Sequence, residues 1–315
     1  MERRRDHTLT GRVAFSAADC AGEKPPLHRE LPPRRLRRGS RLGGRSGRSE
    51  SRWTVGCVQA TTVERSLVRA LESWKESSMT YIAGVDGCRG GWIAVSKEAE
   101  SGILSSELHP SARSLVRGSS ADVLAVDIPV GLTDQGQRQC DVEARRKLGK
   151  PRSSSVFSPP VRPVISRLTP GTSRENASSF HRKIDGRGLG VQTWGIVPKI
   201  QEVDSLLRQE PNLQSRVREV HPEVSFCTWA GRPMQYSKKR RKGRSERLLL
   251  VNEHFGADAF DSVRAKYLAK EVGHDDILDA FAALWTAERI LGKVNGTLPA
   301  VPPLDSAGLR MEIVY

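Results

Sequence analysis

The sequence predicts an α/β protein, and two stretches carry that prediction. Residues 81–95 contain two apolar runs rich in β-forming residues, separated by a short turn with three glycines. Residues 121–129 are almost continuously apolar, a pattern typical of a strand buried on both faces in the parallel part of a sheet. Stretches with helical apolar spacing, above all residues 274–288, supply the helices.

Residues 1–78 differ in composition from the rest of the chain. They hold about half of the net charge of +15 and include a low-complexity basic run at 32–41. Such a segment buries too little apolar surface to offset the entropy lost on ordering. Three interpretations remain open: a nucleic-acid-binding arm, an organellar targeting peptide, or a start codon assigned too far upstream. Met79 directly precedes the first predicted strand and favours the last interpretation. We therefore expect a basic, disordered extension over 1–78 and one domain over 79–315.

From Met79 onward the pattern alternates between strands and helices. Strands are predicted at 81–85, 92–97, 103–109, 121–129 and 216–220. Helices are predicted at 110–117, 135–150, 174–182, 198–208, 247–255, 257–272 and 274–288. Between them, residues 151–163 are expected to form a loop and residues 186–190 a glycine loop.

The overall composition narrows the classes of partner. The net charge of +15, from 51 Lys and Arg against 36 Asp and Glu, favours a polyanion such as nucleic acid. The five cysteines are scattered without a C-x-x-C pair, which argues against a zinc site or a disulfide framework and fits a reducing cytoplasm. No apolar run reaches the roughly 18 residues of a membrane span. We expect a cytoplasmic protein with no membrane partner.

Acidic residues stand at the ends of two predicted strands and at the start of the last helix. Asp86 and Asp127 end the strands, where a buried charge needs either a metal or a hydrogen bond to the turn amides. On the helix, spacings of three and four residues place Asp279 on roughly the same face as Asp275 and Asp276. Carboxylates in such a group are ligands for hard cations. Asp86, Asp127, Asp276 and Asp279 are therefore the predicted ligands of Mg²⁺ or Mn²⁺.

The same carboxylates also have structural interpretations. Asp275 is favoured as a helix N-cap, Asp127 caps the turn that follows it, and Asp279 pairs with Arg289 or Lys293. These alternatives remain open for each residue singly. Together they require three unrelated coincidences on buried elements, so the group favours a metal site.

Further candidates lie outside this group. Glu223 follows a predicted strand and is a candidate to join the site, whereas His221 is favoured as a hydrogen-bonded structural residue. The basic run 238–244 is usually a solvated loop, but beside an acidic cluster it predicts phosphate contacts. The residues expected to bind nucleic acid are Lys238, Lys239, Arg240, Arg241 and Arg162, with Ser153–Ser155, Gln192 and Trp194 as candidate contacts to sugar or base.

Six motifs from Met79 onward resemble one family. They are G-V-D-G-C-R-G-G-W at 84–92, V-D-I-P-V-G-L at 126–132, R-x-C-D-x-E-A-R at 138–145, S-S-V-F-S-P-P at 154–160, E-V-H-P-E-V-S-F at 219–226 and D-D-I-L-D-A at 275–280. In this order they are similar to domain-of-unknown-function family 429, a group proposed to be ribonuclease H-like nucleases. Residues 1–78 lie outside the resemblance.

The resemblance implies a ribonuclease H-like fold. That fold is a mixed five-stranded sheet, three antiparallel strands followed by two parallel ones, with helices on both sides and here a largely helical insertion after the fourth strand. Asp86 takes the position of the first-strand aspartate and Asp127 that of the fourth-strand carboxylate. Asp276-x-x-Asp279-Ala resembles the acidic pair on the C-terminal helix of Holliday-junction resolvases. The Asp-Ile-Pro of strand four departs from the glutamate common in resolvases.

The function expected from these residues is a metal-dependent nuclease. Two-metal carboxylate chemistry would hydrolyse phosphodiester bonds of DNA or RNA, with Asp86, Asp127, Asp276, Asp279 and Glu223 as the catalytic residues. An ATP-dependent phosphotransferase of the actin and sugar-kinase type is an alternative on the same fold. Its first phosphate loop resembles Asp86-Gly87, but a convincing second and third glycine motif are missing from the sequence. A non-catalytic nucleic-acid-binding protein is the other alternative.

Overall fold

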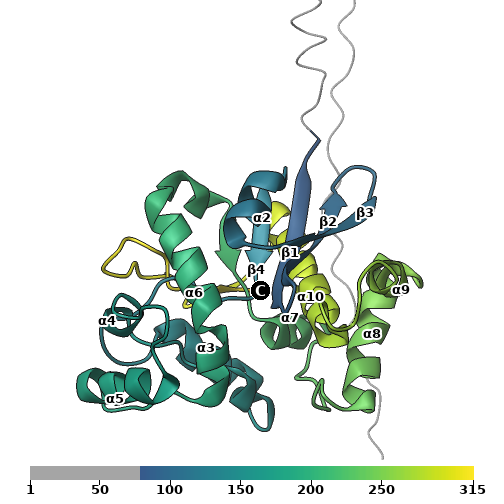
Figure 1. The fold of residues 1–315 in the computed structure, drawn as a ribbon. Coiled ribbons are helices and arrows are strands. Elements are labelled where there is room, and N and C mark those ends of the chain that lie inside the picture. The colour runs from purple at the N-terminus through teal and green to yellow at the C-terminus, as the bar shows by residue number, and fades with distance from the viewer. Residues whose placement is uncertain (1–78) are drawn as a thin grey trace, which may run out of the picture. The chain divides into compact units, whose positions relative to one another are not determined.

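A mixed five-stranded sheet lies at the centre of the computed structural model, which describes residues 79–315 (Figure 1). The strand order is β3-β2-β1-β4-β5. The strands are β1 (Tyr81–Cys88), β2 (Gly91–Glu98), β3 (Leu104–His109), β4 (Val123–Val126) and β5 (Val217–Glu219). Strands β1, β2 and β3 pair with one another in antiparallel fashion, while β4 runs parallel to β1 and β5 runs parallel to β4. The predicted mixed α/β sheet is confirmed, whereas the predicted extension over 1–78 lies outside the described residues.

All the helices of the described residues follow β3 in the chain. They are α2 (Ala112–Gly118), α3 (Gln139–Leu148), α4 (Arg162–Ile165), α5 (Arg174–Asp185), α6 (Val191–Gln209), α7 (Pro222–Trp229), α8 (Arg241–Phe255), α9 (Ala259–Arg264) and α10 (His274–Leu291). Short 3-10 turns and a two-stranded sheet complete the list: Arg152–Ser155, Pro211–Ser215, β6 (Thr297–Leu298) and β7 (Ile313–Val314). Helices α3 to α6 form the expected helical insertion between β4 and β5. Within the described chain, no helix is both long and apolar enough to cross a bilayer.

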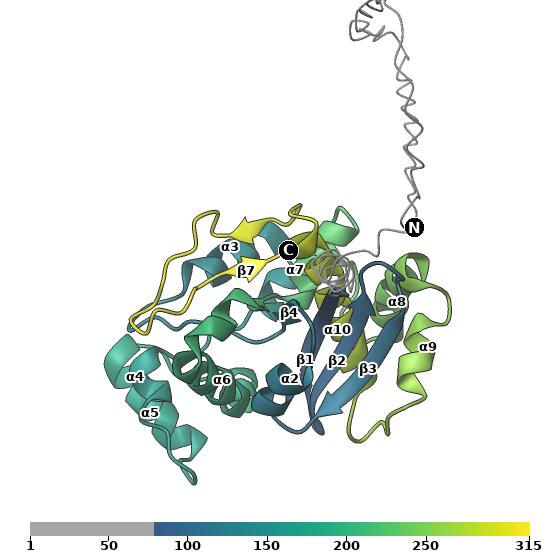
Figure 2. The same cartoon turned by 90° about the horizontal axis from the view of Figure 1, so that it is seen from above.

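Both faces of the sheet are covered by helices. Alternate side chains of each strand point to opposite faces and so pack into two separate hydrophobic cores. Ala83, Val85 and Trp92 face the core shared with α2 and α6. Ile82 and Ile93 face the opposite core, which includes residues of α8, α9 and α10. In Figures 1 and 2, α6 lies on one side of β1–β3, and α8 and α9 lie on the other. The helices on both sides are therefore confirmed as well.

The close approach of α10 to β1 depends on Gly84. A Cβ atom at this position would overlap the carbonyl oxygen of Ala280 and the backbone nitrogen of Leu284. Only glycine lets the helix backbone lie directly on the strand here. This contact also sets the start of α10, with its aspartates, beside the end of β1.

Several helices differ from the sequence prediction, among them α4, which was not predicted, and α8, which begins at Arg241 instead of residue 247. Helix α6 begins at Val191 and continues through Pro198, because burial of Val197 and Ile200 against the sheet outweighs the backbone hydrogen bond that proline removes. Helix α9 is much shorter than the predicted 257–272, since Leu268 is exposed and does not anchor a further turn. Helix α7 was not predicted, although Pro222 is well suited to the first turn of a helix.

Candidate active site

A cavity of about 520 Å³ collects most of the predicted site residues. It lies at the carboxyl ends of β1 and β4, against the start of α10. Seven predicted residues line it: Asp86, Asp127, Glu223, Lys238, Lys239, Asp276 and Asp279. Ser154, Ser155, Gln192 and His221 line it too, as do Lys199, Phe157 and Arg152. The structure therefore brings these distant segments together around one cavity.

The register of the parallel strands puts two aspartates next to each other. Val85 of β1 is level with Val126 of β4, and the Asp127 backbone N–H donates to the Val85 carbonyl at 2.9 Å. Asp86 is 7% exposed and accepts one hydrogen bond, from the Gly87 N–H at 2.7 Å. Burial, followed by the charges of Asp127 and Asp279, raises the pKa of Asp86 well above its ordinary value. Burial and the Asp279 charge likewise raise the pKa of Asp127 to about 8.

Helix α10 supplies the remaining aspartates. Its N-cap is Gly273, and the Asp276 carboxylate accepts a hydrogen bond from the Gly273 N–H at 2.7 Å, as the third residue of a capping box does. The prediction that Asp275 is the N-cap is therefore wrong, because the helix starts at His274 and Gly273 takes the N-cap position. Asp279 lies one turn further on and is 2% exposed. Burial is also the main cause of a raised pKa at Asp276.

Lys238 reaches into this carboxylate group from the segment between α7 and α8. Its ammonium forms an ion pair with Asp279. Burial opposes the charge of Lys238, but Asp279, Asp86 and Asp127 outweigh that effect and raise the lysine pKa. The predicted pairing of Asp279 with Arg289 or Lys293 is therefore wrong. The sequence gives no signal that Lys238 points inward while its neighbours Lys239 and Arg240 are exposed.

Several buried polar atoms at the cavity have no hydrogen-bond partner among residues 79–315. Three of them are acceptors, Oδ1 of Asp279, Oε2 of Glu223 and Nδ1 of His221, and a fourth is the donor Nε of Arg152. A buried polar atom left without a partner costs free energy, so such atoms point to a bound group or ion. Two of the four are carboxylate oxygens, the donors that Mg²⁺ and Mn²⁺ prefer. The residues present thus fit a hard divalent cation.

Glu223 is held by a residue that the sequence analysis missed. The Arg247 Nη2 donates to Glu223 Oε1 at 2.5 Å, and both side chains are buried. His221 directly precedes α7, and its Nε2–H donates to the Ser155 carbonyl at 3.3 Å, so Nδ1 is the ring nitrogen without a proton. Burial lowers the His221 pKa, which favours this neutral ring. His221 is thus hydrogen-bonded, as expected, and also lines the cavity.

Comparison with known proteins assigns the chain to a family. A family model described as a protein of unknown function (DUF429) matches residues 84–305. The chain belongs to the DUF429 family. All six motifs of the sequence analysis lie within the matched residues. No curated protein matches the chain, and no solved structure matches it.

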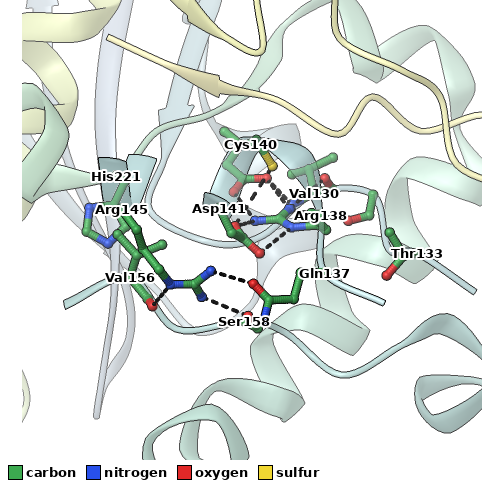
Figure 3. Close-up of polar contacts among 12 residues, drawn as sticks. Val130, Thr133, Gln137, Arg138, Cys140, Asp141, Arg145, Val156, Ser158 and His221 are labelled. Atoms are coloured by element: carbon green, nitrogen blue, oxygen red, sulfur yellow. Dashed lines mark hydrogen bonds and ion pairs between the residues drawn. The ribbon is translucent and has the colours of Figure 1, made fainter. Parts of the chain in front are cut away.

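Residues of the DUF429 motif at 138–145 do not line the cavity but hold together the segments that surround it. Arg138 donates to Asp141 Oδ1 at 2.6 Å and to both oxygens of Glu219 at 2.7 Å (Figure 3). Glu219 ends β5 and also accepts from the Val130 N–H at 2.6 Å, so this ion pair ties α3 to β5 and to the segment after Asp127. No signal in the sequence pairs Arg138 with a residue 81 positions away.

Arg145 of the same motif fixes the cavity wall. It donates to the Val156 carbonyl at 3.1 Å and to Ser158 Oγ at 2.7 Å (Figure 3). Ser155 and Phe157, which line the cavity, lie in this stretch. The motif thus holds the site in place rather than contributing ligands to it.

Among the described residues of this DUF429 chain, the ligand atoms that already lie close enough together to hold a metal ion belong to a different, buried cluster. The ligand atoms of Cys140, Asp141 and Glu219 lie within 4.8 Å of one another. Arg138 already forms ion pairs with both carboxylates. Burial raises the pKa of the Cys140 thiol, which disfavours the thiolate that a metal needs. The cluster is therefore a structural ion pair as it stands.

The structure separates the remaining predicted residues from the cavity. Arg162 is buried in α4, where it pairs with Asp204 at 2.9 Å and with Asp305. The prediction that Arg162 contacts nucleic acid is wrong for this side chain, because the two carboxylates hold it inside the protein. Arg240 and Arg241 are exposed but do not line the cavity, and Trp194 lines a neighbouring one.

Proposed function

We propose that the chain is a metal-dependent nuclease with a ribonuclease H-like fold. The observation that carries the proposal is the convergence of Asp86, Asp127 and Asp279, from two parallel strands and a helix, in one cavity. The strand order and strand directions agree with the fold that the resemblance implies. The unpartnered oxygens of Asp279 and Glu223 add the second line of support.

Asp86, Asp127, Asp276 and Asp279 would hold Mg²⁺ or Mn²⁺. A cation bound there would activate water and stabilise the leaving oxygen. In the hydrolysis, water oxygen bonds to phosphorus, the bond from phosphorus to the leaving oxygen breaks, and the leaving oxygen takes up a proton. Glu223 has one oxygen free to accept a hydrogen bond from the attacking water, and His221 Nδ1 offers a second acceptor.

Basic residues beside the cavity favour an extended polyanion as substrate. An adjoining cavity of about 630 Å³ shares Gly87, Lys199 and Asp276 with the first and adds Arg89 and Arg244. A third shares Arg89 and Lys199 and adds Trp194, an aromatic surface on which a base can stack. Phosphates on either side of the cleaved bond would meet these cations, whereas a small phosphate ester would leave them unused.

The phosphotransferase alternative has less support. Its nucleotide phosphates need more than one glycine loop at the site. The weak second candidate, Gly186–Gly190, contributes Gly188 to a different cavity, which is also lined by His181 and Arg187. The carboxylate-rich cavity has Gly87 as its glycine.

The test is a nuclease screen of the full chain with Mg²⁺ or Mn²⁺. Labelled single- and double-stranded DNA, RNA and RNA–DNA hybrids serve as substrates. We expect cleavage of at least one of them, and a loss of about 1000-fold or more in Asp86→Asn and in Asp279→Asn. Asp258→Asn is the matched control, because Asp258 is exposed and lies outside the cavity. Absence of cleavage of every substrate with either cation, or full activity in Asp86→Asn, would contradict the proposal.

A further inference from the structure

Lys238 occupies an unusual position for a residue in a basic surface run. Its neighbours Lys239, Arg240 and Arg241 are exposed, whereas its own ammonium is paired with the buried Asp279. The pair places a fixed positive charge among the carboxylates that would hold a metal. The metal-dependent hydrolysis proposed for the cavity assigns no role to this ammonium.

The backbone around Lys238 is fastened to α8, so the inward position is built into the fold. The N–H groups of Gln235 and Tyr236 donate to Glu246 at 2.9 and 3.1 Å. The Arg247 Nη1 donates to the Tyr236 carbonyl at 3.1 Å. In addition, a Cβ at Gly243 would overlap the Ser237 carbonyl, so α8 lies directly on the segment that precedes Lys238.

The same helix positions both Lys238 and Glu223. Arg247 fastens the Lys238 segment with Nη1 and holds Glu223 with Nη2. Lys238 therefore has a defined place relative to the cavity wall. A lysine that merely reached in from a solvated loop would need none of these contacts.

Charge limits how many cations the group accepts. An ammonium paired with Asp279 and close to Asp86 and Asp127 repels any further cation bound to the same carboxylates. At the same time, an ammonium in a carboxylate cavity can donate to a phosphate oxygen.

We propose that Lys238 supplies one of the positive charges of the catalytic site, so that the cavity binds a single divalent cation and the Lys238 ammonium contacts the reacting phosphate. This inference rests on the proposed nuclease function and replaces the two-ion arrangement expected from the sequence. Lys238 then acts as a catalytic residue rather than as part of a surface that attracts nucleic acid.

The test is the stoichiometry of Mn²⁺ binding to the full chain, measured by titration calorimetry without substrate. We expect one ion per chain in the wild type and in Lys238→Arg. In Lys238→Met, which keeps the length of the side chain but not its charge, we expect a second ion or a roughly tenfold tighter first ion, since about 1.4 kcal/mol is tenfold. Lys239→Met, at the exposed neighbouring position, is expected to bind as the wild type does.

A second readout separates this role from a structural one. Lys238→Met is expected to lower kcat by about 100-fold while Mn²⁺ binding tightens, two changes in opposite directions that misfolding does not produce. Lys238→Gln repeats the measurement if the methionine variant does not fold. Two ions in the wild type, or unchanged stoichiometry and affinity in both charge-removing variants, would overturn the inference and leave the nuclease proposal standing. No ion in any variant would overturn both.

Discussion

Arg247 and Glu223 form a fully buried ion pair, with 2.5 Å between Nη2 and Oε1, and the second oxygen of Glu223, a residue that lines the cavity, has no hydrogen-bond partner among residues 79–315. The pair joins α8 to α7. It leaves half of the Glu223 carboxylate available for the site while the other half is fixed. A buried pair of this kind is costly to break on one side.

Arg247→Met is expected to destabilise the protein by about 3–5 kcal/mol, because Glu223 then carries an uncompensated buried charge. Urea unfolding measures the change. The double variant Glu223→Met with Arg247→Met is expected to recover most of that loss. Arg241→Met, at an exposed position of the same helix, is the control and should leave stability within about 0.5 kcal/mol. Equal losses in Arg241→Met and Arg247→Met would show that the ion pair is not the cause.

Asp86→Asn is expected to raise the melting temperature of the metal-free protein by a few degrees. The substitution removes one charge from a group in which burial and neighbouring carboxylates both disfavour ionisation. Mn²⁺ is expected to raise the melting temperature of the wild type, because it binds the native state preferentially, and not that of the variant. Differential scanning fluorimetry with and without EDTA measures both effects. An equal metal-dependent rise in the two proteins would place the ion elsewhere.

Metal affinity is expected to rise with pH until about pH 8. The pKa of Asp127 is raised to about 8 in the folded, metal-free protein, against an ordinary value of 3.8. The folded state therefore binds more protons than the unfolded state between these values. It follows that the contribution of Asp127 to stability is fully present below pH 3.8 and is lost as the pH rises to about 8.

In the metal-free protein the ionised form of Asp127 is disfavoured up to about pH 8. A bound cation has the opposite effect, because it favours the ionised carboxylate. Calorimetric Mn²⁺ titrations between pH 6 and 9 measure the dependence, with an expected gain of up to about tenfold per pH unit for each proton released. Asp127→Asn is expected to flatten the curve. A pH-independent affinity in the wild type would contradict the assignment of Asp127 as a ligand.

Gly84→Ala is expected to destabilise the protein by about 1–3 kcal/mol or more, since its Cβ would force α10 away from β1. Gly195→Ala is the matched control: Gly195 lies in α6 with open space around it, and alanine there is expected to be stabilising by up to about 1 kcal/mol. Thermal and urea unfolding of the two variants give the comparison. A neutral Gly84→Ala would mean that α10 shifts without cost.

The exposed basic residues are expected to govern the salt dependence of nucleic-acid binding. A triple substitution of Lys239, Arg240 and Arg241 by methionine should weaken binding and lower the slope of log K against log salt by about 0.7–0.9 for each lost phosphate contact. Fluorescence anisotropy with a labelled oligonucleotide, in EDTA to prevent cleavage, measures the slope. The run is only a solvated surface if the slope of the triple variant equals that of the wild type.

The features predictable from the sequence are local ones. Asp86 and Asp127 were identifiable because strand periodicity shows where a strand ends, and parallel strands share the edge at which their carboxyl ends lie. Asp276 and Asp279 followed from helical spacing in the same way. The mixed sheet came from a resemblance carried by six motifs, because local patterns do not give strand order.

Long-range pairing accounts for what the sequence could not predict. The sequence around Arg138 and Arg162 gives no sign that they are buried, yet each pairs with a carboxylate that is distant in sequence. Lys238 and Lys239 are adjacent and chemically identical, and only the fastening of their segment to α8 turns one of them inward. Whether a lysine or arginine side chain points inward depends on the residue it pairs with in the folded protein. The hydrophobic periodicity of the sequence does not reveal that residue.

The contact at Gly84 also decides when the site comes into existence. The strand that carries Asp86 is translated before the helix that carries Asp279. A chain still attached to the ribosome has a β1 surface with no α10 to cover it, and its carboxylate group lacks the Asp276 and Asp279 members. The carboxylate group of the cavity is therefore completed only after α10 has been translated and has packed on β1.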